Sequence, residues 1–377
     1  MRLLSLAALL LTCLHSLAQK PVAAQPSDAW LQFAVQKNGD YLYGYKDKNG
    51  HVRVPAKFGN FTNAQKFTHI IAVSEAGTHQ QYYLLRNGRK VGVDSVYMFD
   101  FTFDCEREGK IRFEDRKKNR IGFLNIQGRA IIPAMYNFVT PFQNGLAVAR
   151  VGARAKCWSS ENDTIRCEHL GWVGGRDVLI NERNEILADS LAEGQWAHLN
   201  WYSLKINPAE VDTALTSSFR GKQGDRYTFI NYEKEFTQWL YEVFVPAVRT
   251  GNDKQVAALC FPELAVAARP FKGWPHFQRA AFMTKYYQSV LRPKLGMLHR
   301  DSKNVAVLSE ELNTYIFSGS LFQLFMTDCG AHFQDKYPVF DVMLTYAAPP
   351  GQKSDEYHNH FEFIRTPQGY RLLSVGL

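Results

Sequence analysis

The sequence lacks the features that would identify a membrane protein or a common type of enzyme. Beyond residue 14 it has no apolar run approaching the roughly 20 residues of a transmembrane helix. It has no serine nucleophile elbow, phosphate-binding loop or His-Glu-x-x-His motif. None of its 6 cysteines has Cys-x-x-Cys spacing, so neither a zinc site nor a redox motif is indicated. We therefore assign no catalytic residue and expect no cofactor.

Residues 1–18 have the composition of a signal peptide. Arg2 precedes an apolar run from Leu3 to Leu14, and Ser16-Leu17-Ala18 supplies the small residues that a signal peptidase requires. We expect cleavage near Ala18 and a location in the periplasm, at the cell surface or outside the cell. Cys13 raises lipidation as an alternative, although Thr12 stands where a smaller residue is normally required.

The net charge is basic but does not indicate a nucleic-acid partner. Cleavage removes Arg2 and no acidic residue, so the charge falls from +8 to +7. Export separates the chain from nucleic acid, and the bases are spread over hairpins. The one tight cluster, Arg116-Lys117-Lys118-Asn119-Arg120, lies between two predicted strands and is typical of a solvated turn, with an anion-binding patch as the alternative.

Five cysteines remain after cleavage. Cys157 and Cys167 bracket a short polar insertion, and in an oxidising compartment we expect a disulfide between them. Cys105, Cys260 and Cys329 stand in apolar surroundings and are predicted to be buried thiols.

The N-terminal half repeats a β pattern, most completely in Arg120–Gly152. This stretch predicts a strand at Ile121–Ile126, a turn at Gln127-Gly128, a strand at Arg129–Pro133 and a strand at Leu146–Val151. When Gly44 is aligned with Gly122, the turn, the proline and the following aromatic of Tyr41–Gly77 fall into register, as Asn49-Gly50, Pro55 and Phe58. A degenerate copy follows Tyr82, and a last copy begins at Gly171-Trp172 and continues over Asp177–Ile186. The glycine before each aromatic permits a close backbone approach or a bulge, and a single hairpin cannot bury its apolar face alone.

This pattern resembles the WG repeat, whose features are a Gly-aromatic start, a turn, Val-Ile-Pro, an aromatic and then Phe-x-x-Gly-Leu-Ala-x-Val. The resemblance is specific for Arg120–Gly152, which ends Phe142-Gln143-Asn144-Gly145-Leu146-Ala147-Val148, and it extends over roughly 38–190. It implies a repeat scaffold of stacked antiparallel hairpins and carries over no catalytic residue. We place the β-repeat domain at 38–191.

Residues 192–231 break the periodicity and are predicted to form a polar junction. We expect Trp196, Trp201 and Tyr202 to pack one domain against the next, with carbohydrate stacking as the alternative for the two tryptophans.

The part from 232 to 377 is predicted to be an α+β domain. A helical stripe starts at Tyr232, a short helix covers Lys254–Cys260, and a third helix covers Phe277–Leu291 with Phe282, Tyr286, Ser289 and Val290 inside. Strands are predicted at Asn304–Leu308, Thr314–Phe317, Leu321–Met326, Val339–Tyr346, His358–Arg365 and Tyr370–Val375. This order resembles the NTF2-like cone, in which a curved sheet wraps a long helix, and such a cone serves enzymes, carriers and adaptors alike.

Two groups of side chains could carry chemistry in this part. Glu356, His358, His360 and Glu362 alternate along a strand and point the same way, so they could bind a metal, although the pattern favours a solvent-facing polar row. Asp328, His332 and Asp341 could lie on the concave face of a cone, although their spacing matches no motif.

The sequence therefore favours an exported, non-enzymatic protein of a bacterial envelope. Its β repeats would bind a protein or another envelope component. The alternative is that the C-terminal cone holds a small ligand or performs a simple hydrolysis or isomerisation, which requires a deep open pocket. Metal binding at His358 and His360 is a third hypothesis.

Overall fold

The protein is β-rich throughout. The computed structural model describes residues 28–157, 170–192, 194, 196–268, 272–300, 302–347 and 356–377. The predicted signal peptide and Cys167 lie outside the described residues. Among the helices of the described part, none is both long and apolar enough to cross a membrane.

The N-terminal part consists of small antiparallel sheets. Four of them follow one another with the orders β3-β2-β1-β4, β5-β6-β7, β10-β11-β12 and β13-β14-β17-β18, and β8-β9 and β15-β16 form separate pairs. The strands are β1 (Trp30–Lys37), β2 (Asp40–Lys46), β3 (Val52–Phe58), β4 (Lys66–Phe67), β5 (Ile70–Ser74), β6 (Gln81–Leu85), β7 (Lys90–Val91), β8 (Met98–Phe99), β9 (Thr102–Phe103), β10 (Lys110–Asp115), β11 (Arg120–Asn125), β12 (Ala130–Tyr136), β13 (Phe138–Val139), β14 (Leu146–Val151), β15 (Arg154–Cys157), β16 (Leu170–Val173), β17 (Arg176–Asn181) and β18 (Ile186–Leu191).

The strand registers confirm the alignment of Gly44 with Gly122. In β2–β3 the paired residues are Tyr43 with Phe58, Tyr45 with Val54 and Lys46 with Val52. In β11–β12 they are Ile121 with Tyr136, Phe123 with Ile132 and Leu124 with Ala130. Every pair in the first hairpin becomes a pair in the second when the same offset is added, so the two copies share their bulge as well as their turn.

The bulge explains why both copies need glycine. A Cβ on Gly44 would lie 2.7 Å from the backbone nitrogen of Ala56, and a Cβ on Gly122 would lie 2.7 Å from that of Ala134. Real Cβ atoms do not approach backbone this closely, so the expected close approach is confirmed.

The last copy departs from the expected boundaries. Gly171-Trp172 lies in β16, which pairs with β15, so the prediction that the copy begins there is wrong. The equivalent hairpin is β17–β18, where Leu179 pairs with Ala188 and Ile180 with Ile186, which places Val178 at the glycine position. Two residues of β18 lie opposite Val178 in this bulge, whereas three residues lie opposite the glycine in each of the two other hairpins. The shorter bulge leaves room for a side chain at this position.

Each repeat copy contributes to two sheets. The strand Leu146–Val151 matches β14 as predicted, yet β14 pairs with β13 and β17 and not with the hairpin of its own copy. In the same way β5 pairs with β6 of the following hairpin. The chain therefore crosses from sheet to sheet within every copy.

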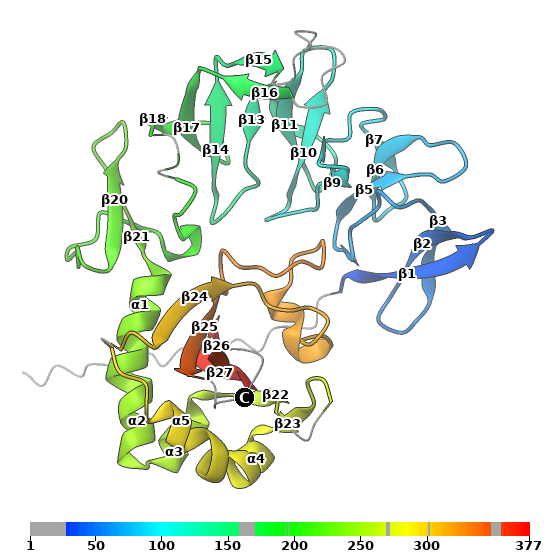
Figure 1. Ribbon diagram of the computed structural model, residues 1–377. Helices are drawn as coiled ribbons and strands as arrows, with labels where there is room; N and C mark the ends of the chain where they lie inside the picture. The colour runs from blue at the N-terminus through cyan, green and yellow to red at the C-terminus, as the bar shows by residue number, and fades with distance from the viewer. Residues whose placement is uncertain are drawn as a thin grey trace, which may run out of the picture.

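Apolar clusters lie between consecutive sheets. One joins Tyr45 and Phe58 to Tyr82, a second joins Tyr83 to Leu124, and a third joins residues of β11 and β12 to Ala147, Val178 and Ile180. The sheets follow an arc, and the segment 311–338 of the C-terminal part lies on its inner side (Figure 1).

The predicted polar junction contains a sheet of its own, with the order β19-β21-β20, formed by β19 (Lys205–Ile206), β20 (Thr216–Arg220) and β21 (Arg226–Ile230). Its apolar cluster takes in Trp201, which is buried and contacts Phe229 with ring centroids 5.2 Å apart. Trp196 donates from its indole to Asp177. Both tryptophans therefore pack within the protein, in agreement with the packing interpretation.

The C-terminal part contains a six-stranded sheet with the order β23-β22-β27-β26-β25-β24. Its strands are β22 (Cys260–Ala267), β23 (His276–Gln278), β24 (Val305–Glu310), β25 (Val339–Ala347), β26 (Glu356–Thr366) and β27 (Gly369–Gly376). The strands predicted at Thr314–Phe317 and Leu321–Met326 are wrong, because the first is a turn and the second is a 3₁₀ helix, Ser320–Phe325. In that helix Phe322 and Phe325 are buried three residues apart, which is the spacing of a 3₁₀ turn. Strand β22 was not predicted, and its parallel pairing with β27 joins segments distant in sequence.

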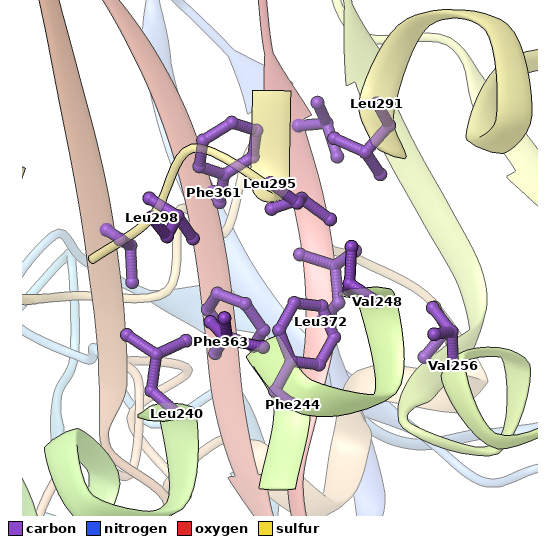
Figure 2. Packing of buried hydrophobic residues seen from close by; sticks show 14 of the residues in the cluster. Leu240, Phe244, Val248, Val256, Leu291, Leu295, Leu298, Phe361, Phe363 and Leu372 are labelled. Carbon is purple, nitrogen blue, oxygen red and sulfur yellow. The ribbon is translucent and has the colours of Figure 1, made fainter. Parts of the chain in front are cut away.

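Two helical segments cover one face of this sheet (Figure 2). They are built from α1 (Tyr232–Trp239), α2 (Val245–Thr250) and α3 (Asp253–Ala258), and from α4 (Arg279–Phe282) and α5 (Arg292–Leu295). The π-helical stretch Met283–Leu291 shifts the predicted inner face, since Phe282, Tyr287 and Leu291 are buried while Val290 is exposed. The prediction that Ser289 and Val290 lie inside is therefore wrong.

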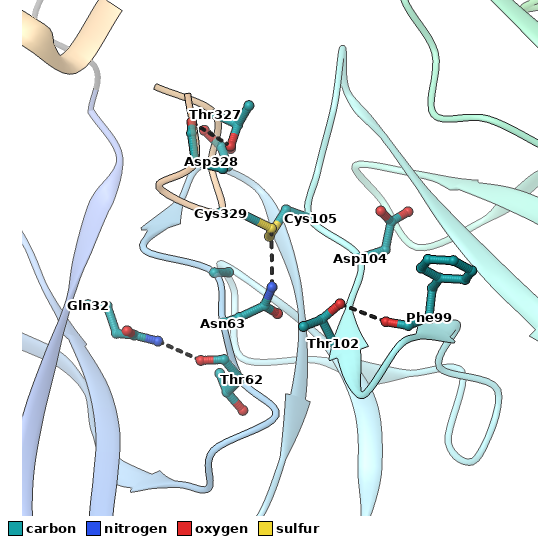
Figure 3. The surroundings of a disulfide bond; sticks show 12 residues. Gln32, Thr62, Asn63, Phe99, Thr102, Asp104, Cys105, Thr327, Asp328 and Cys329 are labelled. Carbon is teal, nitrogen blue, oxygen red and sulfur yellow. Dashed lines mark hydrogen bonds between the residues drawn. A yellow bond between two sulfur atoms is a disulfide. The ribbon is translucent and has the colours of Figure 1, made fainter. Parts of the chain in front are cut away.

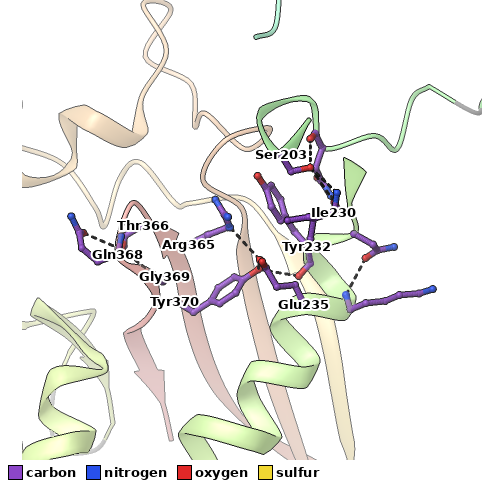
Figure 4. Close-up of polar contacts among 12 residues, drawn as sticks. Ser203, Ile230, Tyr232, Glu235, Arg365, Thr366, Gln368, Gly369 and Tyr370 are labelled. Atoms are coloured by element: carbon purple, nitrogen blue, oxygen red, sulfur yellow. Dashed lines mark hydrogen bonds and ion pairs between the residues drawn. The ribbon is translucent and has the colours of Figure 1, made fainter. Parts of the chain in front are cut away.

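The start of α1 is fixed to the sheet by polar contacts (Figure 4). Tyr370 donates its hydroxyl to Glu235 at 2.7 Å, and Arg365 contacts the same carboxylate at 3.4 Å. Ser203 accepts the backbone N–H of Ile230 at 2.8 Å just before the helix. The start of α1, which directly follows the junction sheet, is thus bound to the C-terminal sheet.

Candidate functional site: the disulfide-bonded contact and an exposed hairpin

A disulfide joins the repeats to the C-terminal part. Cys105 follows β9, Cys329 lies in the segment 311–338, and their Cα atoms are 5.8 Å apart across a sequence separation of 224 (Figure 3). The prediction that both are buried thiols is wrong, because the fold brings two distant apolar environments into one cluster. Cys260 is the buried free thiol expected. Cys157 is disulfide-bonded, and since Cys167 lies outside the described residues their pairing stays a prediction.

Hydrogen bonds surround the disulfide. The backbone carbonyl of Asp328 accepts from the backbone nitrogens of Gln65 at 2.8 Å and Lys66 at 3.0 Å. Lys66 also donates its ammonium to the carbonyl of Gln323 at 3.0 Å, and Asn63 donates to the sulfur of Cys329. The segment 311–338 is therefore bound to the repeats through backbone as well as through sulfur.

A second contact lies farther along the same segment. Asp335 accepts from Arg107 at 3.1 Å and from Gln143. Phe333 contacts Tyr202 edge-on with ring centroids 5.2 Å apart, and the guanidinium of Arg107 lies 4.7 Å above the Phe333 ring. These residues come from four different stretches of sequence.

A cavity of about 300 Å³ lies between the two contacts. Most of the residues that line it are polar or charged, although apolar atoms also contribute; they are Thr68, Glu106, Arg107, Glu108, Tyr202, Met326, Thr327, Asp328, Phe333 and Lys336. Burial is the main cause that raises the pKa of Asp328 to about 6; the nearby Glu106 carboxylate acts in the same direction, and Thr68, Lys66 and His69 oppose it. Thr68 donates its hydroxyl to this carboxyl at 3.0 Å.

The raised pKa of Asp328 predicts that the contact between the segment 311–338 and the repeats is more stable in mild acid than at neutral pH. Because the folded protein binds this proton more tightly than the unfolded chain, the stabilisation is present in full below about pH 4 and is lost as the pH rises through about 6. Asparagine does not titrate, so only the wild type should lose this stabilisation as the pH rises. The free energy of unfolding of Asp328→Asn minus that of the wild type should therefore increase by about 1 kcal/mol from about pH 4 to about pH 8, after allowance for partial solvent screening. Urea unfolding at the two pH values measures this gain. An equal difference between the proteins at both values would contradict it.

The alternating acidic and histidine row does not form a metal cluster. His358 shares a hydrogen bond with Thr345 at 3.0 Å, Glu362 accepts from Ser374, and burial raises the pKa of Glu362. Glu356 begins the strand, and the three core-facing residues Asn359, Phe361 and Phe363 are buried on the other face. Within the described ranges no group of three or more His, Cys, Asp or Glu side chains could hold a metal ion.

The second predicted group is spread over separate networks. Asp328 lies where the segment 311–338 contacts the repeats. His332 accepts from the backbone nitrogen of Leu312 at 3.1 Å, and its other ring nitrogen contacts the carbonyl of Tyr337. Burial lowers the pKa of His332. Asp341 is buried and contacts the Nδ1 atom of His360 at 2.6 Å. The structure thus pairs one residue from each predicted group and assembles neither group.

The space between the C-terminal helices and sheet is filled. Phe236 stacks on Phe340 with centroids 4.7 Å apart, and Phe363 contacts Phe244 at 4.9 Å. All four rings belong to one buried apolar cluster, part of which is drawn in Figure 2. The open pocket required by the small-ligand alternative is therefore occupied by side chains.

The hairpin β8–β9 presents the most exposed phenylalanines of the described residues. Phe99 is 66% exposed and Phe101 is 76% exposed. The turn residues Asp100 and Phe101 have φ values of 46° and 57°, in the left-handed region where phenylalanine is uncommon. Such strain persists only where the surrounding structure imposes it, and it often marks a functional position.

The base of this hairpin is firmly held. Phe103 is buried and contacts Phe61 at 5.8 Å between ring centroids, and Thr102 donates its hydroxyl to the Phe99 carbonyl at 2.7 Å. Asp104 then pairs with Arg112 at 2.8 Å, next to the disulfide at Cys105. The two exposed rings are consequently presented by an immobilised base. Sequence analysis missed this site, although two phenylalanines that flank an aspartate were a usable signal.

Comparison with known proteins supports the repeat assignment. The family model described as WG containing repeat matches residues 121–154. No curated protein matches the chain. A solved structure assigned as a calcium/calmodulin dependent protein kinase II association domain from Xanthomonas campestris is 13% identical and covers 38% of this chain and 84% of that one, with a TM-score of 0.18. At this TM-score the likeness carries no argument about the C-terminal fold.

Proposed function

We propose that the protein is exported to the bacterial envelope and acts there as a non-enzymatic interaction scaffold. In this proposal residues 1–18 are removed, stacked β repeats over 38–191 bind a protein or another envelope component, the junction 192–231 follows, and the α+β part 232–377, with an NTF2-like arrangement, supports the repeats. The Cys105–Cys329 bond supports export, because structural disulfides persist in oxidising compartments.

The single observation that carries the scaffold proposal is the exposed hairpin. Two phenylalanines that are more than half exposed lie two residues apart in sequence, at a strained turn. An exposed apolar feature on a fixed base is typical of a protein contact site, since aromatic side chains contribute most to such interfaces. The filled C-terminal interior removes the main support for a ligand-binding alternative.

The test is affinity capture from envelope extract with the mature protein and a hairpin variant, Phe99→Thr/Phe101→Asn. Threonine suits a strand and asparagine tolerates the left-handed region, so we expect the variant to fold at least as well as the wild type. A partner captured reproducibly by the wild type should fall at least tenfold with the variant, because an aromatic hot spot contributes about 2 kcal/mol or more.

The matched control is Tyr315→Ser, which removes an aromatic ring that is 97% exposed outside the repeats. It should capture the partner as well as the wild type does. Equal capture by the hairpin variant would refute the role of the hairpin, and the lack of any reproducible partner would count against the scaffold itself.

A further inference from the structure

The C-terminal sheet ends in an open edge. β24 is its terminal strand and pairs with β25 alone, over an unbroken register from Val305 opposite Leu344 to Glu310 opposite Val339. Its residues Leu308, Ser309 and Glu310 are exposed, and the strand lies at one margin of the sheet in Figure 1.

The direction of the free backbone groups follows from one hydrogen bond. The backbone nitrogen of Thr345 donates to the carbonyl of Asn304 at 2.8 Å, so Asn304 directs its polar groups toward β25. Because antiparallel pairs alternate, those of Ala306 and Leu308 point the same way, while Val307 and Ser309 point outward. Within the described residues, neither Val307 nor Ser309 makes a backbone hydrogen bond to another element.

The edge has little of the usual protection against pairing, since its charges stand only at the end of the strand, in Glu310, and outside it, in Lys303 and Glu311. Proteins block open edges with proline, lysine, a bulge or a covering segment. The strand reads Val-Ala-Val-Leu-Ser-Glu, and its register with β25 has no irregularity. Its open side therefore offers a regular template for another strand, apolar from Val305 to Leu308.

We propose that β24 pairs with β24 of a second copy of this chain, in an antiparallel arrangement centred on Val307. This register places the outward groups of the two strands opposite each other and pairs Val305 with Ser309 and Ala306 with Leu308. It also sets Lys303 of each copy opposite Glu311 of the other, and both of these residues are exposed. A register centred on Ala306 or on Leu308 would also place the outward backbone groups opposite each other. Neither of these registers, however, would bring Lys303 of one copy opposite Glu311 of the other.

The size of the contact sets its strength. Strands of six residues bury far less than the roughly 1,600 Å² of a standard interface, so the dimer should be weak and dependent on concentration. This association goes beyond the proposed scaffold function and involves none of the residues of the exposed hairpin.

The experiment is sedimentation velocity on the mature full chain over a wide concentration range. We expect the wild type to pass from one to two chain masses as the concentration rises. Lys303→Glu or Glu311→Lys alone places like charges opposite each other twice in the symmetric dimer, and each should raise the dissociation constant about tenfold. The double variant restores both pairs with reversed charges and should dimerise like the wild type.

A backbone variant gives an independent reading. Ser309→Pro removes one outward donor without touching the ladder to β25, and it should abolish the dimer, whereas Ser309→Ala keeps the donor and should not. Melting temperatures within a few degrees of the wild type establish that the variants are folded. A protein that stays monomeric at every concentration would overturn the proposal, as would a dimer indifferent to the charge changes and to proline.

Discussion

Replacing Cys105 and Cys329 together with serine is expected to lower the free energy of unfolding by up to about 5 kcal/mol. The bond closes a loop of 224 residues, and in the chain-entropy view the restriction of the unfolded chain grows with the logarithm of loop length. The other contacts of the segment 311–338 with the repeats are mainly individual hydrogen bonds and an ion pair, so we also expect this segment to become the first part accessible to protease.

Urea unfolding of both proteins, with and without reductant, measures the effect. Reductant should destabilise the wild type strongly and should change the serine variant only through the bond at Cys157. The two proteins should then have similar midpoints when both are reduced. A serine variant as stable as the oxidised wild type would show that the Cys105–Cys329 bond does not stabilise the contact between the repeats and the C-terminal part.

Gly122→Ala is expected to cost about 3 kcal/mol or more, a large effect for the addition of one methyl group. The new Cβ would lie 2.7 Å from the backbone nitrogen of Ala134, and backbone in a paired strand cannot move aside cheaply. The bulge would have to open, and the buried pair of Phe123 and Ile132 would lose its register. Thermal and urea unfolding measure the loss.

Gly77→Ala is the matched control, since nothing lies within 4 Å of a Cβ placed there. It should change stability by less than about 0.5 kcal/mol. Gly44→Ala should behave like Gly122→Ala, because the two glycines occupy the same repeat position. If all three variants were equally stable, the shared bulge would not be the reason for the glycine.

The parts of the fold that are local in sequence were predictable. The turns, the prolines and the two glycines define hairpins whose partners lie within about fifteen residues, and their registers agree with the alignment. The strands β25, β26 and β27 also follow their alternating patterns closely. In these elements the side-chain period alone is sufficient, because one face is buried.

The parts that depend on distant segments were not predictable. The pairing of β22 with β27 and the bond between Cys105 and Cys329 exist only once the chain has folded. Leu321–Met326 has apolar residues that suit a strand or a helical turn, and tertiary packing of Phe322 and Phe325 decides for the 3₁₀ helix. Val178 shows the same limit within the repeats, since a bulge shorter by one residue relieves the need for glycine.

The candidate site was likewise predictable only in part. Two of the residues chosen for their chemistry, His360 and Asp341, contact each other, and neither belongs to a group of three or more His, Cys, Asp or Glu side chains among the described residues that could hold a metal ion. Asp328 was chosen for a cone and instead contacts the repeats. The exposed hairpin has only a weak sequence signal, two phenylalanines that flank an aspartate, and its exposure and backbone geometry are needed to recognise it.

The central claim is that the repeats and the C-terminal part form one exported, disulfide-bonded unit. The most direct test is peptide mapping by mass spectrometry, without reduction, on the full-length protein expressed in and recovered from bacterial cells. The account predicts a mature N-terminus near Gln19 and a peptide cross-linked through Cys105 and Cys329. A chain that begins at Met1 and carries both cysteines as free thiols would contradict it.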